Sequence, residues 1–157
     1  MKKSRKIIYV IGFVLVAVFL FAAIRQCTVY YILPPDQDMA EQLYAYDQDA
    51  FELIIDYFVE SGDVHIRIYD DSDMHIGGKK IEDKRVSDAL KKLLTIKDYN
   101  MIGRNGDTVY FEKWSFGERS RGIAYSITGE ETLLIDCLVK QEPLSRTGWY
   151  YYETEYD

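Results

Sequence analysis

An uninterrupted apolar run near the N-terminus is the strongest pattern in the chain. It extends from Ile7 to Ile24, 18 residues without a charge. As a helix, this run measures about 27 Å, close to the roughly 30 Å hydrocarbon thickness of a bilayer. Lys2, Lys3, Arg5 and Lys6 precede it, so the positive-inside rule places the N-terminus in the cytoplasm and the rest of the chain outside. The pattern predicts a single-pass membrane protein.

A cleaved signal peptide is the alternative, because a basic start and an apolar core occur there too. Residues 22–27, AAIRQC, fit neither a small-x-small cleavage site nor a lipobox, which favours an uncleaved anchor. The predicted organisation is a cytoplasmic tail at 1–6, a transmembrane helix at 7–24, a juxtamembrane linker at 25–37 and an extracytoplasmic domain at 38–157.

Two segments of the domain show helical periodicity. The first runs from Asp38 to Glu60, with Asp36 or Asp38 as its cap and with Ser61-Gly62-Asp63 as its end. The second runs from about Asp83 to Ile96 and ends in lysines, which suit the C-terminal end of a helix dipole. Both carry apolar residues three and four apart, as expected of helices that pack on a core.

Alternation of apolar and polar residues predicts strands in the rest of the domain. Val64 to Tyr69 reads as a half-buried strand. Asn105-Gly106 between two such runs predicts a tight hairpin. Gly122 to Ile127 would extend this meander with its odd positions facing the core, and Gly148 to Tyr152 would close the sheet.

The segment from Leu133 to Leu138 is ambiguous, since its leucines fit one face of a short helix while its start could equally begin a strand. We predict a helix there, and a frayed acidic end from Glu153 to Asp157. The fold class is therefore predicted to be α+β, with two or three helices packed on an antiparallel sheet.

The charge of the domain limits its partners. Five of the 19 Lys and Arg residues precede Asp36, so the rest of the chain carries 14 of them against all 26 acidic residues, a net charge of −12. Phosphate backbones and anionic headgroups would be repelled, so we expect no nucleic-acid ligand and favour a basic protein or an envelope component. Cys27 and Cys137 are too few for a disulfide framework.

The acidic stretch after the first strand is a weak candidate for metal binding. Asp70, Asp71, Asp73 and His75 could converge on a cation. The spacing echoes a calcium loop, but Ile76 stands where that loop needs glycine. A solvated turn is the favoured interpretation, and no cofactor is expected.

Aromatic residues near the C-terminus are candidates for partner binding. Trp149, Tyr150, Tyr151 and Tyr152 could offer rings to a peptide or glycan, although a strand would turn alternate rings toward the core. No Gly-x-Ser-x-Gly elbow or recognisable catalytic cysteine occurs, so no catalytic residue is assigned.

Three short stretches at the C-terminal end carry a family resemblance. Arg121 to Ser126 reads RGIAYS, Glu142 to Leu144 reads EPL, and Gly148 to Glu153 reads GWYYYE. Together they resemble small uncharacterised single-pass membrane proteins of Firmicutes. The resemblance covers the last quarter of the chain and implies a Gram-positive origin and a compact extracytoplasmic domain, with no activity attached.

These observations predict a membrane-anchored, non-catalytic interaction module. An inhibitor or immunity-like protein is one specific version, because an acidic surface complements a basic toxin or hydrolase. One alternative is a metal-dependent, membrane-anchored enzyme that uses Asp70, Asp71, Asp73 and His75. Another is a small subunit of a membrane complex.

Overall fold

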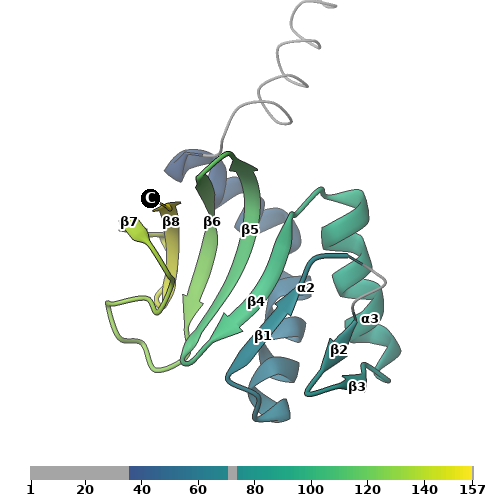
Figure 1. The fold of residues 1–157 in the computed structure, drawn as a ribbon. Coiled ribbons are helices and arrows are strands. Elements are labelled where there is room, and N and C mark those ends of the chain that lie inside the picture. Colours follow the sequence, from purple (N-terminus) through teal and green to yellow (C-terminus); the bar gives the residue numbers. More distant parts are fainter. Residues whose placement is uncertain (1–35, 71–73, 157) are drawn as a thin grey trace, which may run out of the picture. The chain divides into compact units, whose positions relative to one another are not determined.

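Two helices cover one face of a six-stranded antiparallel sheet in the computed structural model, which describes residues 36–70 and 74–156 (Figure 1). The sheet order is β1-β4-β5-β6-β8-β7, and β2 and β3 form a separate hairpin. The elements are α2 (Gln37–Ser61), β1 (His65–Ile68), β2 (His75–Ile76), β3 (Lys79–Lys80), α3 (Lys84–Lys91), η1 (Lys92–Ile96), β4 (Met101–Asn105), β5 (Thr108–Phe116), β6 (Arg119–Ser126), β7 (Leu138–Pro143) and β8 (Trp149–Glu155). The α+β prediction is confirmed at this level.

The predicted membrane anchor, Ile7 to Ile24, lies outside the described residues. Among the helices within 36–70 and 74–156, none is both long and apolar enough to span a bilayer.

Helix α2 confirms the first helical prediction and its cap. The Asp36 carboxylate accepts a hydrogen bond from the Met39 backbone N–H at 2.9 Å, which satisfies one of the free donors at the helix start. At the other end Gly62 adopts φ +73°, the left-handed conformation that commonly terminates helices.

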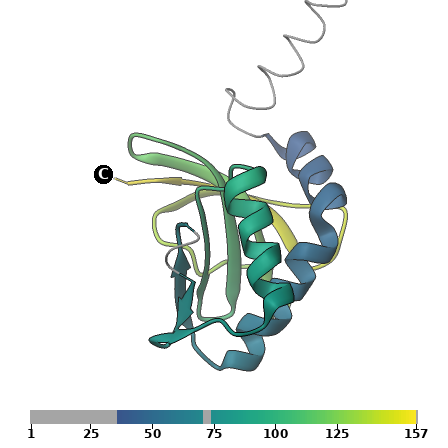
Figure 2. The ribbon, with the colours of Figure 1, turned by 90° about the vertical axis from the view of Figure 1, so that its right-hand side faces the viewer.

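The second predicted helix is also present, but its last turns widen. Asp83 caps α3 by accepting from the Arg85 backbone N–H at 2.8 Å. From Lys92 to Ile96 the chain continues as the π-helix η1. Figure 2 shows α3 lying beside α2 on the same side of the sheet.

A buried charge ties these two helical segments together. Helix α2 is kinked at Asp47, where φ is −122° and ψ is 15°, and this side chain is only 1% exposed. The ammonium groups of Lys92 and Lys97 lie 3.1 and 3.5 Å from one of its oxygens. The carboxylate therefore has its countercharges on η1 and the residue that follows, which positions the π-helix against α2.

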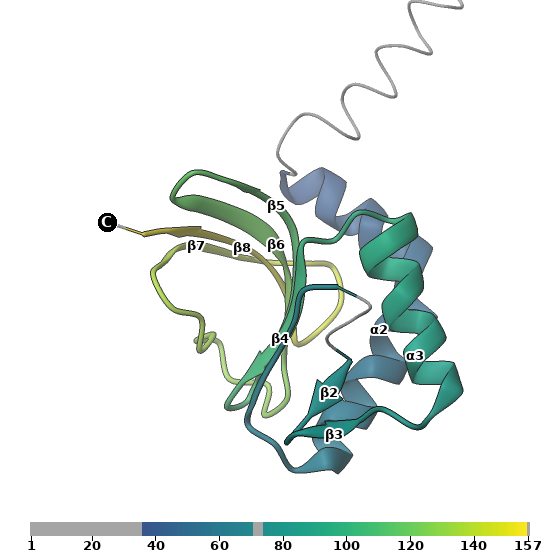
Figure 3. The same ribbon diagram turned by 45° about the vertical axis from the view of Figure 1, so that its right-hand side comes forward.

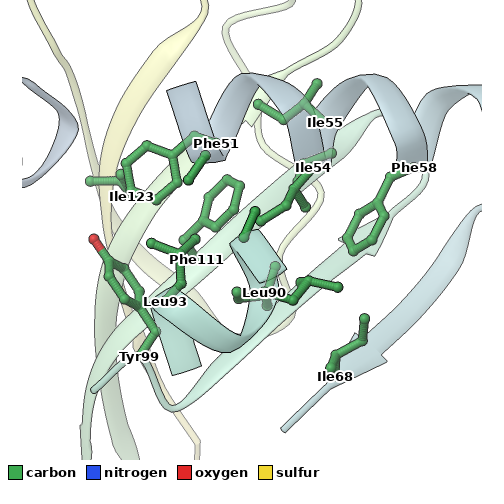
Figure 4. Close-up of a cluster of buried hydrophobic side chains, with 14 of the residues drawn as sticks. Phe51, Ile54, Ile55, Phe58, Ile68, Leu90, Leu93, Tyr99, Phe111 and Ile123 are labelled. Atoms are coloured by element: carbon green, nitrogen blue, oxygen red, sulfur yellow. The ribbon is translucent and has the colours of Figure 1, made fainter. Parts of the chain in front are cut away.

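The main core lies between the helices and the sheet. Phe51, Ile54 and Phe58 of α2 and Leu90 of α3 are fully buried and meet side chains such as Phe111 of β5 (Figure 4). The Phe51 ring centre lies 4.6 Å from that of Phe111 and 5.7 Å from that of Trp149. Contacts between aromatic rings thus join α2 to the middle of the sheet.

A second, smaller core lies on the other face of the sheet. It contains Tyr110, Ala124, Tyr150 and Tyr152 from three strands, together with Leu133 from the segment between β6 and β7. Figure 3 shows this segment on the side of the sheet opposite α2 and α3. Both faces of the central strands are therefore covered, one by the helices and the other by the single segment between β6 and β7.

The helix predicted from Leu133 to Leu138 is wrong. This segment is irregular until β7 begins at Leu138, and Cys137 has φ +55°. The Leu134 backbone N–H donates to the Thr108 hydroxyl at 2.8 Å. Leu133 is buried while Leu134 is exposed, so the leucine spacing reflects attachment to the sheet face and not a helical stripe.

Two boundaries of the meander also differ from the prediction. The hairpin is present, but Asn105 pairs with Thr108, so Gly106 and Asp107 form its turn in place of Asn105-Gly106. The acidic end is not frayed from Glu153, because β8 continues to Glu155 and pairs with Arg119 of β6.

Candidate functional site

A cavity of about 90 Å³ opens on the second face of the sheet. Its lining comes from β1, β4, β5, β6 and β8 and from the segment between β6 and β7. The lining residues are Arg67, Tyr69, Met101, Asn105, Tyr110, Glu112, Ser120, Leu134, Ile135, Asp136, Tyr152, Thr154 and Tyr156. Segments far apart in the sequence thus contribute polar and aromatic side chains to one cavity.

Two glycines make this part of the sheet possible. A Cβ at Gly103 would lie 2.6 Å from the Tyr110 hydroxyl oxygen and 2.6 Å from the Ile66 carbonyl oxygen, so the Tyr110 side chain occupies the space above this residue. A Cβ at Gly122 would lie 2.2 Å from the Phe111 carbonyl oxygen. Glycine therefore permits close packing under and beside the cavity.

The four tyrosines of the lining differ in exposure. Tyr110 and Tyr152 are buried, whereas Tyr69 and Tyr156 are exposed at the rim. Burial raises the pKa of Tyr110 and, more strongly, that of Tyr152. The phenols consequently stay protonated at neutral pH and can both donate and accept hydrogen bonds.

Glu112 is the buried carboxylate of the cavity, with 8% of its surface exposed. Burial raises its pKa, and hydrogen bonds from the side chains of Ser120, Ser115 and Asn100 act in the opposite direction. No ion pair to Glu112 occurs within the described part of the chain. The carboxylate thus has neutral partners and lacks a countercharge.

Arg67 and Asp136 form an ion pair at the edge of the cavity. The guanidinium lies 3.3 Å from the carboxylate, and both side chains are more than half exposed. The two residues also line, with Asn105, a wider open depression beside the cavity. A ligand can therefore approach the cavity across this depression.

The aromatic residues singled out in the sequence are all buried. Trp149 and Tyr151 belong to the core under the helices, and Tyr150 and Tyr152 belong to the core on the second face. The expected alternation between faces is present. Of the four, Tyr152 lines the cavity.

The acidic candidates are only partly described. Asp71 and Asp73 lie outside the described residues, while Asp70 and His75 are exposed. Among the residues that the structure describes, no group of three or more His, Cys, Asp or Glu side chains is arranged to hold a metal ion.

Similarity to known proteins does not assign a function to this cavity. Comparisons with protein families, with curated proteins and with solved structures each give no match. The geometry of the cavity therefore carries the functional interpretation by itself.

Most of the cavity was not foreseen from the sequence. Tyr69 and Tyr156 follow β1 and β8, whereas Tyr110 and Glu112 lie on β5, and sequence spacing does not bring these three parts of the chain together. One signal was present. Tyr110 and Glu112 alternate with the apolar Val109 and Phe111, which indicates a strand with a polar second face.

Proposed function

We propose that this chain is a single-pass membrane protein whose extracytoplasmic domain is a non-catalytic binding module. The 18-residue apolar run with its basic flank supports the anchor and its direction. The cavity beneath the segment between β6 and β7 is the observation that carries the binding role. It would receive one group of a partner that lies across the adjoining depression.

The size of the cavity favours a group over a whole small molecule. Pockets for drug-sized ligands measure roughly 300 to 1,000 Å³, whereas this cavity measures about 90 Å³. A protruding side chain or a small terminal group of an envelope component has the right dimensions.

The chemistry of the lining favours binding over catalysis. Within the described residues, the lining includes neither histidine nor cysteine. The hydroxyls of Ser120 and Thr154 lie 2.7 Å apart and hydrogen-bond to each other. Serine and threonine nucleophiles are usually activated by a histidine or an amine, whereas the Ser120 hydroxyl hydrogen-bonds to Thr154 and to the Glu112 carboxylate.

The net charge favours a basic partner. A domain with 26 acidic and 14 basic residues after position 35 attracts cationic surfaces and speeds their encounter at low salt. An inhibitor or immunity-like protein that covers a basic toxin or hydrolase is the specific form of this proposal.

Cys137 provides a native reporter of topology, because its thiol is free and exposed. In intact cells carrying Cys27→Ser, we expect a membrane-impermeant maleimide to label Cys137, since the domain faces outward. The labelled chain should remain in the membrane fraction, as detected by gel shift after fractionation.

A cysteine in the N-terminal tail supplies the matched control. Ser4→Cys in a chain that also carries Cys27→Ser and Cys137→Ser should be labelled only after the cells are permeabilised. Labelling of Cys137 only after permeabilisation would contradict the proposed orientation, and a labelled chain released from the membrane would contradict the anchor.

A further inference from the structure

We infer that the cavity on the second face of the sheet binds an alkylammonium group, held between tyrosine side chains and the carboxylate of Glu112. The inference rests on the proposed binding function and specifies its ligand chemistry. A lysine side chain of a partner and a free small amine share this chemistry.

The first support is the missing countercharge of Glu112. Its carboxylate is 8% exposed, and the partners described above are uncharged side chains. A buried carboxylate gains most from a cation that arrives with a hydrogen-bond donor, because desolvation strengthens the attraction between opposite charges. An ammonium group has three such donors.

The aromatic lining is the second support. Tyr69, Tyr110, Tyr152 and Tyr156 surround the same small volume as Glu112. The faces of aromatic rings attract cations, and groups of such rings are a recurrent way to hold alkylammonium ions. The phenol of Tyr152 can in addition accept a hydrogen bond from an ammonium proton, whereas the phenols of Tyr69 and Tyr110 already accept hydrogen bonds from Arg67.

The two arginines near the cavity do not favour an anionic ligand, because each guanidinium already has partners within the protein. Arg67 pairs with Asp136 at 3.3 Å and also donates hydrogen bonds to the hydroxyls of Tyr110 and Tyr69. Arg104, beside the cavity, is buried and donates to the Phe58 carbonyl at 2.6 Å and the Gly106 carbonyl at 2.8 Å. Both cations are thus already engaged, while Glu112 is not paired with one.

Binding of small probes to the full chain in lipid nanodiscs tests the inference. N-acetyl-lysine methylamide is titrated by saturation-transfer NMR, beside N-acetyl-norleucine methylamide, an uncharged probe of similar shape. We expect the lysine probe to bind and the norleucine probe to bind at least tenfold more weakly, since only the former supplies a countercharge.

Two charge-removing variants locate the binding. Glu112→Gln preserves the size of the side chain and should weaken the lysine probe at least tenfold. Glu60→Gln removes an exposed carboxylate near the end of α2 and should leave the affinity unchanged. Tryptophan fluorescence, to which the buried Trp149 contributes, verifies that both variants are folded.

Several results would overturn the inference. The first is equal binding of the two probes, and the second is an unchanged affinity for the lysine probe in Glu112→Gln. The third is an anion site: the lysine probe does not bind, whereas acetate or inorganic phosphate binds and this anion binding is lost in Arg67→Gln. Ethanolamine, titrated in parallel, distinguishes a free small amine from a lysine side chain as the ligand. Tighter binding of ethanolamine than of the lysine probe would identify a free amine as the ligand, and weaker binding would identify a lysine side chain. Labelling of Cys137 does not depend on these titrations, so the proposed function and the ligand chemistry can fail separately.

Discussion

Replacement of Phe51 by alanine is expected to lower the free energy of unfolding by about 4 kcal/mol. The ring is fully buried and lies within 6.4 Å, centre to centre, of the rings of Tyr44, Tyr99, Phe111 and Trp149. Its removal leaves a cavity where α2 meets the sheet, and the surrounding rings belong to four different elements or loops. They cannot all move inward to fill it.

Equilibrium urea unfolding of the full chain in mild detergent, followed by tryptophan fluorescence, measures this loss. Tyr46→Ala is the matched control, because it deletes an aromatic ring from the same helix at a position that is 71% exposed. We expect that control to change stability by less than about 0.5 kcal/mol. Equal losses in the two variants would show that α2 does not pack on the sheet through Phe51.

Gly122→Ala is expected to cost about 3 kcal/mol, a large effect for one methyl group. The new Cβ would lie 2.2 Å from the Phe111 carbonyl oxygen and 3.0 Å from the Glu112 Cα. Both are backbone atoms of β5, next to the register shift between Glu112 and Trp114. Strand β5 must therefore move, and Glu112 moves with it.

Gly117→Ala is the control for this substitution. Gly117 has φ +60° and no neighbouring atom within 4 Å of an added Cβ, so alanine meets only the backbone strain of the left-handed region. That strain costs about 1 kcal/mol. The same urea titration compares the two variants, and a Gly122→Ala chain as stable as Gly117→Ala would contradict the close approach of β5 and β6.

The elements with regular spacing could be predicted from the sequence. Helix α2 has a wide apolar stripe, an aspartate cap and a terminal glycine, and all three agree. The β4-β5 hairpin was correct for a similar reason, although the turn lies one residue later than predicted. Local patterns determine such elements, whereas long-range pairing fixes their exact register.

The segment from Leu133 to Leu138 shows where local patterns fail. Its leucines have helical spacing, but contacts with Thr108 and with the second core decide its conformation. Strand β7, which follows it, pairs with β8 and was not predicted. Tertiary contacts with the sheet outweigh the weak helical preference of this segment.

The cavity could not be predicted because no single segment contains it. Arg67, Glu112 and Asp136 lie on β1, on β5 and in the segment before β7, and the antiparallel order brings them to one face. The acidic stretch from Asp70 to His75 was a candidate site because its polar residues are adjacent in sequence. Adjacent polar residues are common in protein sequences, whereas the burial of Glu112 becomes visible only in the folded domain.

Site-specific photo-crosslinking in cells of the producing organism tests the central claim most directly. A photoreactive phenylalanine derivative replaces Leu134, which is 49% exposed and lines the cavity, or Tyr46, which is 71% exposed on the helical side of the sheet. We predict a discrete adduct with a basic partner or an envelope component from position 134 and none from position 46. The same products from both positions, or no adduct from position 134 in folded, membrane-bound chain, would contradict binding through the cavity.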